Sequence, residues 1–372
     1  MNVMGQPVVI RPFVRGDEEE IVGLLQSVFN GWPHFDLECP PLDHWRWKYE
    51  SNPLRSKAVA VAESGRRIIG CSHGYYLRVK MGQRSLTAQQ GTDLAILEDF
   101  RGMGIYPKMT AIKNEIHKVN NVNLSYGLSI NPVVVRSKIK IDQPQFPSQI
   151  KHMVKIMDTR KHFRTSTSEN NLIKKYGYTS LRILNRVRNI ADLSSHRGSR
   201  SSLEILEATT MDEKMGDFWN EVKGDYNFIV ERDKDYLNWR YCDGRGGKYT
   251  LRYACENDMV LGYIALRVNR FKESYPEGYI ADLLTPLDRI DVAEALIQDA
   301  DRFFAERGVN IVHSLAIKGH PYERLLRRRD FLHDRNKLIL FIRSIGSEDN
   351  LDVLLDSPPN KLHIAYGDVD WI

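Results

Sequence analysis

Two glycines, Gly102 and Gly104, follow a short apolar segment and precede an amphipathic one, an arrangement that can bind an anion. Residues 93–97 predict a strand, and residues 105–119, with apolar side chains at helical spacing, predict a helix. The first amides of a helix have no partner inside it, and the helix dipole favours a negative charge there. Glycine also lets the backbone approach a phosphate closely. The segment therefore predicts a phosphate site for a nucleotide-containing cofactor, with a surface turn before a core helix as the alternative.

Other common chemistries are disfavoured by the sequence. It contains no G-x-x-x-x-G-K-[ST], and the glycine spacing in this loop is not G-x-G-x-x-G, so neither an NTPase nor a dinucleotide-binding fold is indicated. The four cysteines lack C-x-x-C spacing, and the eleven histidines lack metal-ligand spacing. We therefore expect free thiols and no metal site.

The stretch from this strand to this helix resembles the coenzyme A pyrophosphate loop of the GNAT N-acetyltransferase superfamily, whose pattern is Q/R-x-x-G-x-G/A. Arg101 and Gly104 match that pattern, whereas Tyr106 occupies its final small-residue position. The resemblance implies acetyl-CoA or another acyl-CoA as co-substrate. It carries a cofactor-binding role onto these positions: Ile96, Leu97, Arg101, Gly102, Met103, Gly104, Ile105, Tyr106 and Asn131.

The resemblance also divides the roles among those positions. It implies that the backbone at Ile96 and Leu97 binds the pantetheine arm and polarises the acyl carbonyl. Residues 101–106 would bind the pyrophosphate, and Asn131 would hydrogen-bond the pantetheine. Because Pro132 follows Asn131, a plain helix N-cap is the alternative for this asparagine.

The general base of the implied reaction is harder to place. Where many relatives carry a glutamate base and a tyrosine acid, this chain has Gln90 and Lys138. Acyl transfer from a thioester needs a free amine and a protonated leaving thiol. The candidate catalytic groups are Asp93, His73 and the terminal carboxylate of Ile372, since the N-myristoyltransferase and Eis-type groups use the chain terminus as base. A lone histidine is more often structural.

A weak internal repeat places the loop in a larger architecture. At an offset of 192 residues, Asp43, Trp47, Lys48 and Tyr49 align with Asp235, Trp239, Arg240 and Tyr241. Both halves predict the same order: strand, helical stretch, three strands, helix, strand, helix, strand.

This order resembles the GNAT fold twice over. It predicts an α+β protein of two tandem GNAT-like domains, each a mixed, mostly antiparallel sheet flanked by helices. The expected organisation is an acyl-CoA-binding domain (1–158), a basic connector (159–202), a degenerate domain (203–345) and a C-terminal tail (346–372).

The second half lacks the phosphate loop. Residues 285–291 contain no glycine, and Pro286 removes a backbone donor. Asp288 and Asp291 are expected to occupy the helix N-terminus as caps. We therefore expect coenzyme A in the first half only.

The amino-acid composition limits the class of protein, its expected compartment and its possible partners. The 372 residues are 42% hydrophobic, enough for two cores, and no apolar run approaches the ~18 residues of a membrane span. The start of the chain lacks a signal-peptide pattern, so we expect a cytoplasmic protein. Residues 151–200 carry twelve Lys and Arg against three acids, which suits a solvated linker or an anionic partner. Few aromatic residues lie there, so nucleic-acid binding is not favoured.

Together these features predict an acyl-CoA-dependent N-acyltransferase, most simply an N-acetyltransferase, in which an amine attacks the thioester directly. The acceptor is expected to be a small-molecule or peptide amine, and the oligomeric state is not readable. One alternative is a non-catalytic acyl-CoA-binding or regulatory protein, since both usual proton-transfer residues are absent. Another is an interaction protein that uses the basic connector.

Overall fold

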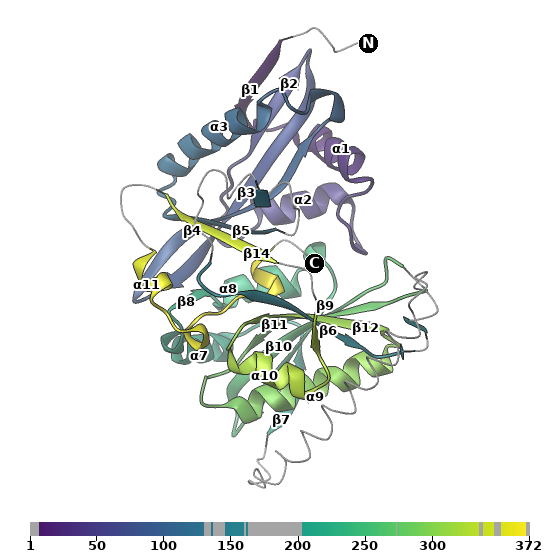
Figure 1. The fold of residues 1–372 in the computed structure, drawn as a ribbon, viewed down its shortest axis with the longest axis vertical. Helices are drawn as coiled ribbons and strands as arrows, with labels where there is room; N and C mark the ends of the chain where they lie inside the picture. The colour runs from purple at the N-terminus through teal and green to yellow at the C-terminus, as the bar shows by residue number, and fades with distance from the viewer. Residues whose placement is uncertain are drawn as a thin grey trace.

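The chain forms two mixed β-sheets flanked by helices, one above the other in Figure 1. The computed structural model describes residues 7–129, 135–136, 146–159, 161–162, 203–272, 274–334, 338–345 and 351–369. Within these ranges each sheet has seven strands. This arrangement confirms the α+β fold class predicted from the sequence.

The first sheet has the strand order β1-β2-β3-β4-β5-β14, with β8 paired to β3. Its strands are β1 (Val8–Pro12), β2 (Ala60–Ser64), β3 (Arg67–Met81), β4 (Arg84–Ile96), β5 (Leu124–Ser129), β8 (Phe228–Val230) and β14 (Ile339–Ser344). Helices α1 (Glu18–Phe29) and α2 (Pro41–Glu50) cover one face, and α3 (Ile105–Val119) covers the other (Figure 1). Along β2 the side chains alternate accordingly: Val61 packs in the core with α1, whereas Ala60 and Ala62 pack with Met109 of α3.

The second sheet has the order β13-β6-β12-β11-β10-β9-β7. Its strands are β6 (Ile150–Ile156), β7 (Glu204–Ala208), β9 (Tyr249–Glu256), β10 (Met259–Asn269), β11 (Glu277–Leu284), β12 (Ile311–Ile317) and β13 (Leu332–His333). Helices α9 (Ile290–Glu306) and α10 (Pro321–Arg328) cover its outer face. Helices α7 (Glu213–Val222) and α8 (Lys234–Leu237) join the core between the two sheets.

The two halves of the chain exchange strands: the first half contributes β6 to the second sheet, and the second half contributes β8 and β14 to the first sheet. Strand β6, from the first half, pairs antiparallel with β12, and β14, from the second half, pairs antiparallel with β5. Figure 1 shows β14 in yellow within the upper sheet. The sheets therefore cross the expected boundaries 1–158 and 203–345, which remain a prediction, and each sheet is completed by the other half.

The repeat becomes a reciprocal contact in three dimensions. The indole nitrogen of Trp47 donates to the backbone carbonyl of Trp239 at 2.9 Å, and that of Trp239 donates to the carbonyl of Trp47 at 3.1 Å. The two rings stack with centroids 4.9 Å apart and planes 18° apart. Equivalent residues that contact each other in both directions lie on a pseudo-two-fold axis.

The C-terminal tail, residues 351–369, lies against both sheets. It contains α11 (Asp352–Leu355) and two short 3₁₀ turns, Pro359–Lys361 and Tyr366–Asp368. Leu362 forms a bridge with Phe228, and Tyr366 is buried beside Tyr279. In the described part of the chain, no helix has the length and apolarity needed to cross a bilayer.

Candidate functional site

Each sheet contains one place where two parallel strands part. Strands β4 and β5 pair only as far as Gln90 and Tyr126; beyond them β4 stays with β3, and β5 stays with β14. We call this divergence the first fork. Strands β11 and β12 pair only as far as Tyr279 and His313, and we call their divergence the second fork.

The glycine loop lies at the end of β4, on one side of the first fork. Gly102 and Gly104 have φ angles of 81° and 70°, in the left-handed region. A Cβ atom added at either residue would meet nothing within 4 Å, so backbone conformation explains these glycines and crowding does not. The Arg101 side chain turns back to the strand, where its Nε donates to the Ile96 carbonyl at 3.2 Å.

The loop presents unused backbone donors. The N–H groups of residues 102–105 have no acceptor among the described residues, and residues 101–104 are exposed. They precede α3, a 15-residue helix whose dipole adds positive potential at the same place. This arrangement can hold an anion.

The corresponding helix of the second half is arranged differently. Helix α9 begins after Arg289, which makes no side-chain cap, so neither Asp288 nor Asp291 is the N-cap residue. The Arg289 guanidinium instead binds the Asp291 carboxylate at 2.9 and 3.0 Å. The carboxylate in the first turn of α9 is therefore paired with a cation of the chain itself.

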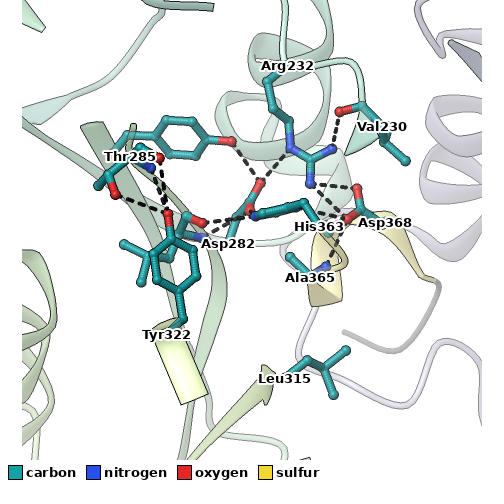
Figure 2. Close-up of polar contacts among 12 residues, drawn as sticks. Val230, Arg232, Asp282, Thr285, Leu315, Tyr322, His363, Ala365 and Asp368 are labelled. Carbon is teal, nitrogen blue, oxygen red and sulfur yellow. Dashed lines mark hydrogen bonds and ion pairs between the residues drawn. The ribbon is translucent and has the colours of Figure 1, made fainter. Parts of the chain in front are cut away.

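The tail occupies the second fork. Residues 362–365 line a cavity together with residues of β11, β12 and α10. His363 Nε2 lies 3.0 Å from the Leu283 carbonyl on β11 (Figure 2). The second fork is thus occupied by the protein's own tail.

Asp93, a predicted catalytic base, is buried next to the first fork. Its carboxylate accepts hydrogen bonds from Trp32 Nε1 at 2.9 Å, from Lys48 Nζ at 2.8 Å and from the Tyr49 hydroxyl. Burial opposes its ionisation, but the charge of Lys48 and these hydrogen bonds outweigh burial and lower the pKa of Asp93 to about 2. A carboxylate with three donors and so low a pKa is a weak proton acceptor, which favours a structural role.

The same pair of residues recurs in the second half. Tyr241, the repeat partner of Tyr49, donates to the Asp282 carboxylate at 3.0 Å, and Tyr263 donates to the same oxygen at 2.8 Å. Since the half without the glycine loop has this buried tyrosine–aspartate contact too, the contact needs no catalytic explanation.

His73, the second predicted catalytic residue, is fully buried behind Asp93. Its Nε2 accepts from Trp45 Nε1 at 3.2 Å, and its Nδ1 donates to the Asp93 carbonyl at 3.0 Å. Burial lowers the pKa of His73 to about 4, so the ring is neutral near pH 7. Both nitrogens are used within the protein. The remaining predicted residues, Asn131 and Ile372, lie outside the described residues, as does Lys138.

Tyr126 is a residue of the first fork that sequence reasoning missed. Gln90 Oε1 and the Tyr126 hydroxyl are both buried and, among the described residues, have no hydrogen-bond partner. Burial raises the pKa of Tyr126 well above its usual value, so the phenol is neutral. In the second fork, Tyr279 donates to Glu277 at 2.9 Å, and His313 Nδ1 lies 3.1 Å from His152 Nε2. His313 Nε2 is buried and, among the described residues, has no hydrogen-bond partner.

A buried ion network around Arg232 was also missed. Arg232 contacts Asp282 at 3.0 Å and Asp368 at 2.7 Å, and all three side chains are fully buried (Figure 2). No local pattern identifies these residues, because charged residues are usually exposed and these come from three distant segments. Through Asp368 the network fixes the tail to the second sheet.

Comparisons with known proteins agree with this geometry at the level of the fold. No family model matches the sequence, and no curated protein does. Saccharomyces cerevisiae N-myristoyltransferase with bound myristoyl-CoA superimposes with a TM-score of 0.61 at 8% identity, over 98% of this chain and 85% of that one. The fold is GNAT-like.

Two further structures have this GNAT-like fold. A probable N-acyltransferase from Enterococcus faecalis matches with a TM-score of 0.59 at 11% identity, over 91% of this chain and 73% of its own. A GCN5-related N-acetyltransferase from Anabaena variabilis matches with a TM-score of 0.59 at 10% identity, over the same shares. At these identities the likeness establishes the fold alone.

Proposed function

We propose that the protein is an acyl-CoA-dependent N-acyltransferase whose cofactor binds at the first fork. The observation that carries this proposal is the row of unused N–H groups at residues 102–105, placed at the start of α3 beside parted strands. Helix N-termini with open amides bind phosphates. The fold neighbours named as acyltransferases support the same reading.

The strand geometry supports one oxyanion donor for this reaction. The Leu97 N–H donates to the Ile69 carbonyl of β3 at 2.9 Å. Amides alternate in direction along a strand, so the N–H of Ile96 is directed to the opposite side, where β5 has diverged. We assign to Ile96 the polarisation of the acyl carbonyl, and to residues 101–106 the pyrophosphate.

The proposed reaction also needs a group that removes a proton from the acceptor amine. Asp93 and His73 are both engaged within the core, so the carboxylate of Ile372 is the remaining base from the sequence. Gln90 and Tyr126 are neutral and can hydrogen-bond an acceptor amine without removing its proton. This neutrality also favours the second candidate function, a non-catalytic acyl-CoA-binding protein.

Acetyl-CoA is the simplest donor, and a small-molecule or peptide amine in the cytoplasm is the expected acceptor. Among the described residues, no group of three or more His, Cys, Asp or Glu side chains could hold a metal ion.

Titration calorimetry of the full chain with acetyl-CoA tests the cofactor site. We expect about one site per chain, and Gly104→Asp should abolish binding because it adds a negative charge among the phosphate-binding amides. Gly308→Asp is a matched control, since Gly308 also has a positive φ of 65° and open space around its Cβ position. Two equivalent sites, no binding, or equal losses in both variants would contradict the proposal. Transfer to a panel of amines then separates an enzyme from a binding protein.

A further inference from the structure

Two histidines stack on each other at the last rung of the second fork. The rings of His152, on β6, and His313, on β12, have centroids 5.1 Å apart and planes 14° apart. His152 Nε2 lies 3.1 Å from His313 Nδ1, close enough for one hydrogen bond between the rings. The two side chains are 14% and 13% exposed, so protons can reach them from solvent.

A carboxylate stands at each end of this histidine pair. Asp334, directly after β13, has its Oδ2 3.2 Å from His152 Nδ1. Glu277, on β11, has its Oε2 3.6 Å from His313 Nε2. The contact with His313 lowers the pKa of Glu277, so this carboxylate is ionised at neutral pH. The four residues therefore form a row that follows the strand order β13-β6-β12-β11 across the second sheet.

The row has one hydrogen too few when both rings are neutral. It contains three contacts, and each needs one hydrogen between two atoms that otherwise only accept. A carboxylate supplies none, and a neutral imidazole supplies one N–H. Two neutral rings thus fill two of the three contacts, whichever tautomers they adopt. The contact to Glu277 is the longest, and His313 Nε2 has no hydrogen-bond partner among the described residues, so the missing hydrogen belongs there.

Two tyrosines face the row without adding charge. Tyr279 of β11 stacks on His313 with centroids 4.9 Å apart, and its hydroxyl donates to Glu277 at 2.9 Å. Tyr366 of the tail packs edge-on against both His152 and Tyr279. Burial raises the pKa of both phenols, so they stay neutral at physiological pH.

The remaining charged groups act on the ends of the row. They are His333 near His152, Lys272 near Glu277 and Arg267 near Tyr279. Their positive charges oppose proton uptake, whereas the two carboxylates of the row favour it. Burial and the charge of a protonated His313 lower the pKa of His152 to about 4. The pair therefore takes up one proton well before it can take up a second.

We propose that the His152–His313 pair is a pH-sensitive site that binds one shared proton, which enters at His313 Nε2 and completes the row from Asp334 to Glu277. With the proton bound, side chains join β6, which comes from the first half of the chain, through β12 to β11. Loss of the proton opens the join to Glu277. This site is independent of the proposed cofactor site at the first fork.

NMR of the full chain with ¹⁵N-labelled histidine, titrated from pH 9 to pH 5, provides the test. We expect the ring nitrogens of His152 and His313 to shift with one common midpoint and to gain one proton between them. Glu277→Gln keeps the size of the side chain but removes its charge, so it should lower that midpoint by about one pH unit or more. Glu207→Gln, on the opposite edge strand β7, is the matched control and should leave the midpoint unchanged.

Three results would overturn the proposal. One is a separate midpoint for each histidine, and another is the uptake of two protons between pH 9 and pH 5. The third is an unchanged midpoint in a folded Glu277→Gln variant. Asp334→Asn provides the same test at the other end of the row, where the carboxylate is 32% exposed and its replacement should leave the fold intact. It too should lower the midpoint, and an unchanged midpoint there would equally count against the shared proton.

Discussion

The first fork, between β4 and β5, and the second fork, between β11 and β12, share one strand pattern but hold different groups. Both part after a paired rung, Gln90–Tyr126 in one and Tyr279–His313 in the other. Beside the first fork lies an exposed glycine loop with unused amides. The second fork is occupied by the tail, and the adjacent helix carries an arginine–aspartate pair at its start.

The comparison separates scaffold from function. Features present at both forks, such as the buried tyrosine–aspartate contact and the reciprocal tryptophans, are explained by a duplicated fold. Features present at one fork alone need a separate reason. Binding of the proposed cofactor explains the glycine loop. The buried ion network around Arg232 fixes the C-terminal tail between the sheets.

The largest expected effect comes from breaking the buried ion network around Arg232. Arg232→Met removes the cation shared by the buried carboxylates of Asp282 and Asp368. Breaking a buried ion pair by removing one partner costs about 3–5 kcal/mol, and with two carboxylates stranded we expect about 5 kcal/mol. Urea unfolding of the full chain measures this loss of unfolding free energy.

The control for this variant is Arg289→Met, which breaks the partly exposed pair with Asp291. That substitution should change the unfolding free energy by about 1 kcal/mol or less. Similar losses in the two variants would show that the buried network contributes no more than a surface pair. The second fork would then lack the anchor that distinguishes it from the first.

Local structure was largely readable from the sequence. The helix predicted over residues 105–119 is α3, with the same bounds. That prediction follows from side-chain periodicity, which depends on local geometry alone. The exchange of β6, β8 and β14 between the sheets was missed, because side-chain periodicity indicates which face of a strand is buried but not which sheet the strand joins.

The candidate site was readable only where a local motif carries it. The glycine loop was found from spacing, because the backbone conformation it requires is local. Asp93 was identified from the sequence as a candidate base. The hydrogen bonds that its carboxylate accepts from Lys48 and Tyr49 depend on how α2 packs against the sheet, which the sequence does not show. Tyr126 was missed because its position opposite Gln90 follows from the register between strands far apart in sequence.

Asp93→Asn tests whether the two buried aspartates are equivalent. The change removes the buried carboxylate that Lys48 Nζ contacts at 2.8 Å, and we expect a loss of about 3–4 kcal/mol in unfolding free energy. Turnover per folded molecule, measured with acetyl-CoA and an accepted amine, should stay within about threefold of the parent. Loss of a general base would lower turnover about a hundredfold or more. Asp282→Asn is the matched variant, and we expect it to behave in the same way.

His73 gives the first fork a pH-dependent contribution at a position where the second has none, because the repeat places Ala265 at the matching position. The native pKa of about 4 lies below the ordinary value of 6.5, so the unfolded chain binds a proton first as pH falls. The stabilisation is complete above pH 6.5 and is lost as pH falls toward 4, about 3 kcal/mol in all. His73→Gln should flatten the stability–pH curve by that amount. Parallel curves for the parent and His73→Gln would contradict this assignment.

The smallest effect tests the pseudo-two-fold axis itself. Trp47→Phe and Trp239→Phe each remove one indole donor from a buried carbonyl while keeping an aromatic ring in the stack. Losing such a hydrogen bond costs about 1 kcal/mol, and because the two contacts are reciprocal we expect the two losses to agree within about 0.5 kcal/mol. The double variant should show a coupling of about 0.5–1 kcal/mol, since the two rings are in contact. Clearly unequal single losses in urea unfolding would mean that the halves contribute differently even at their axis, and the two forks could then no longer be compared as copies of one scaffold.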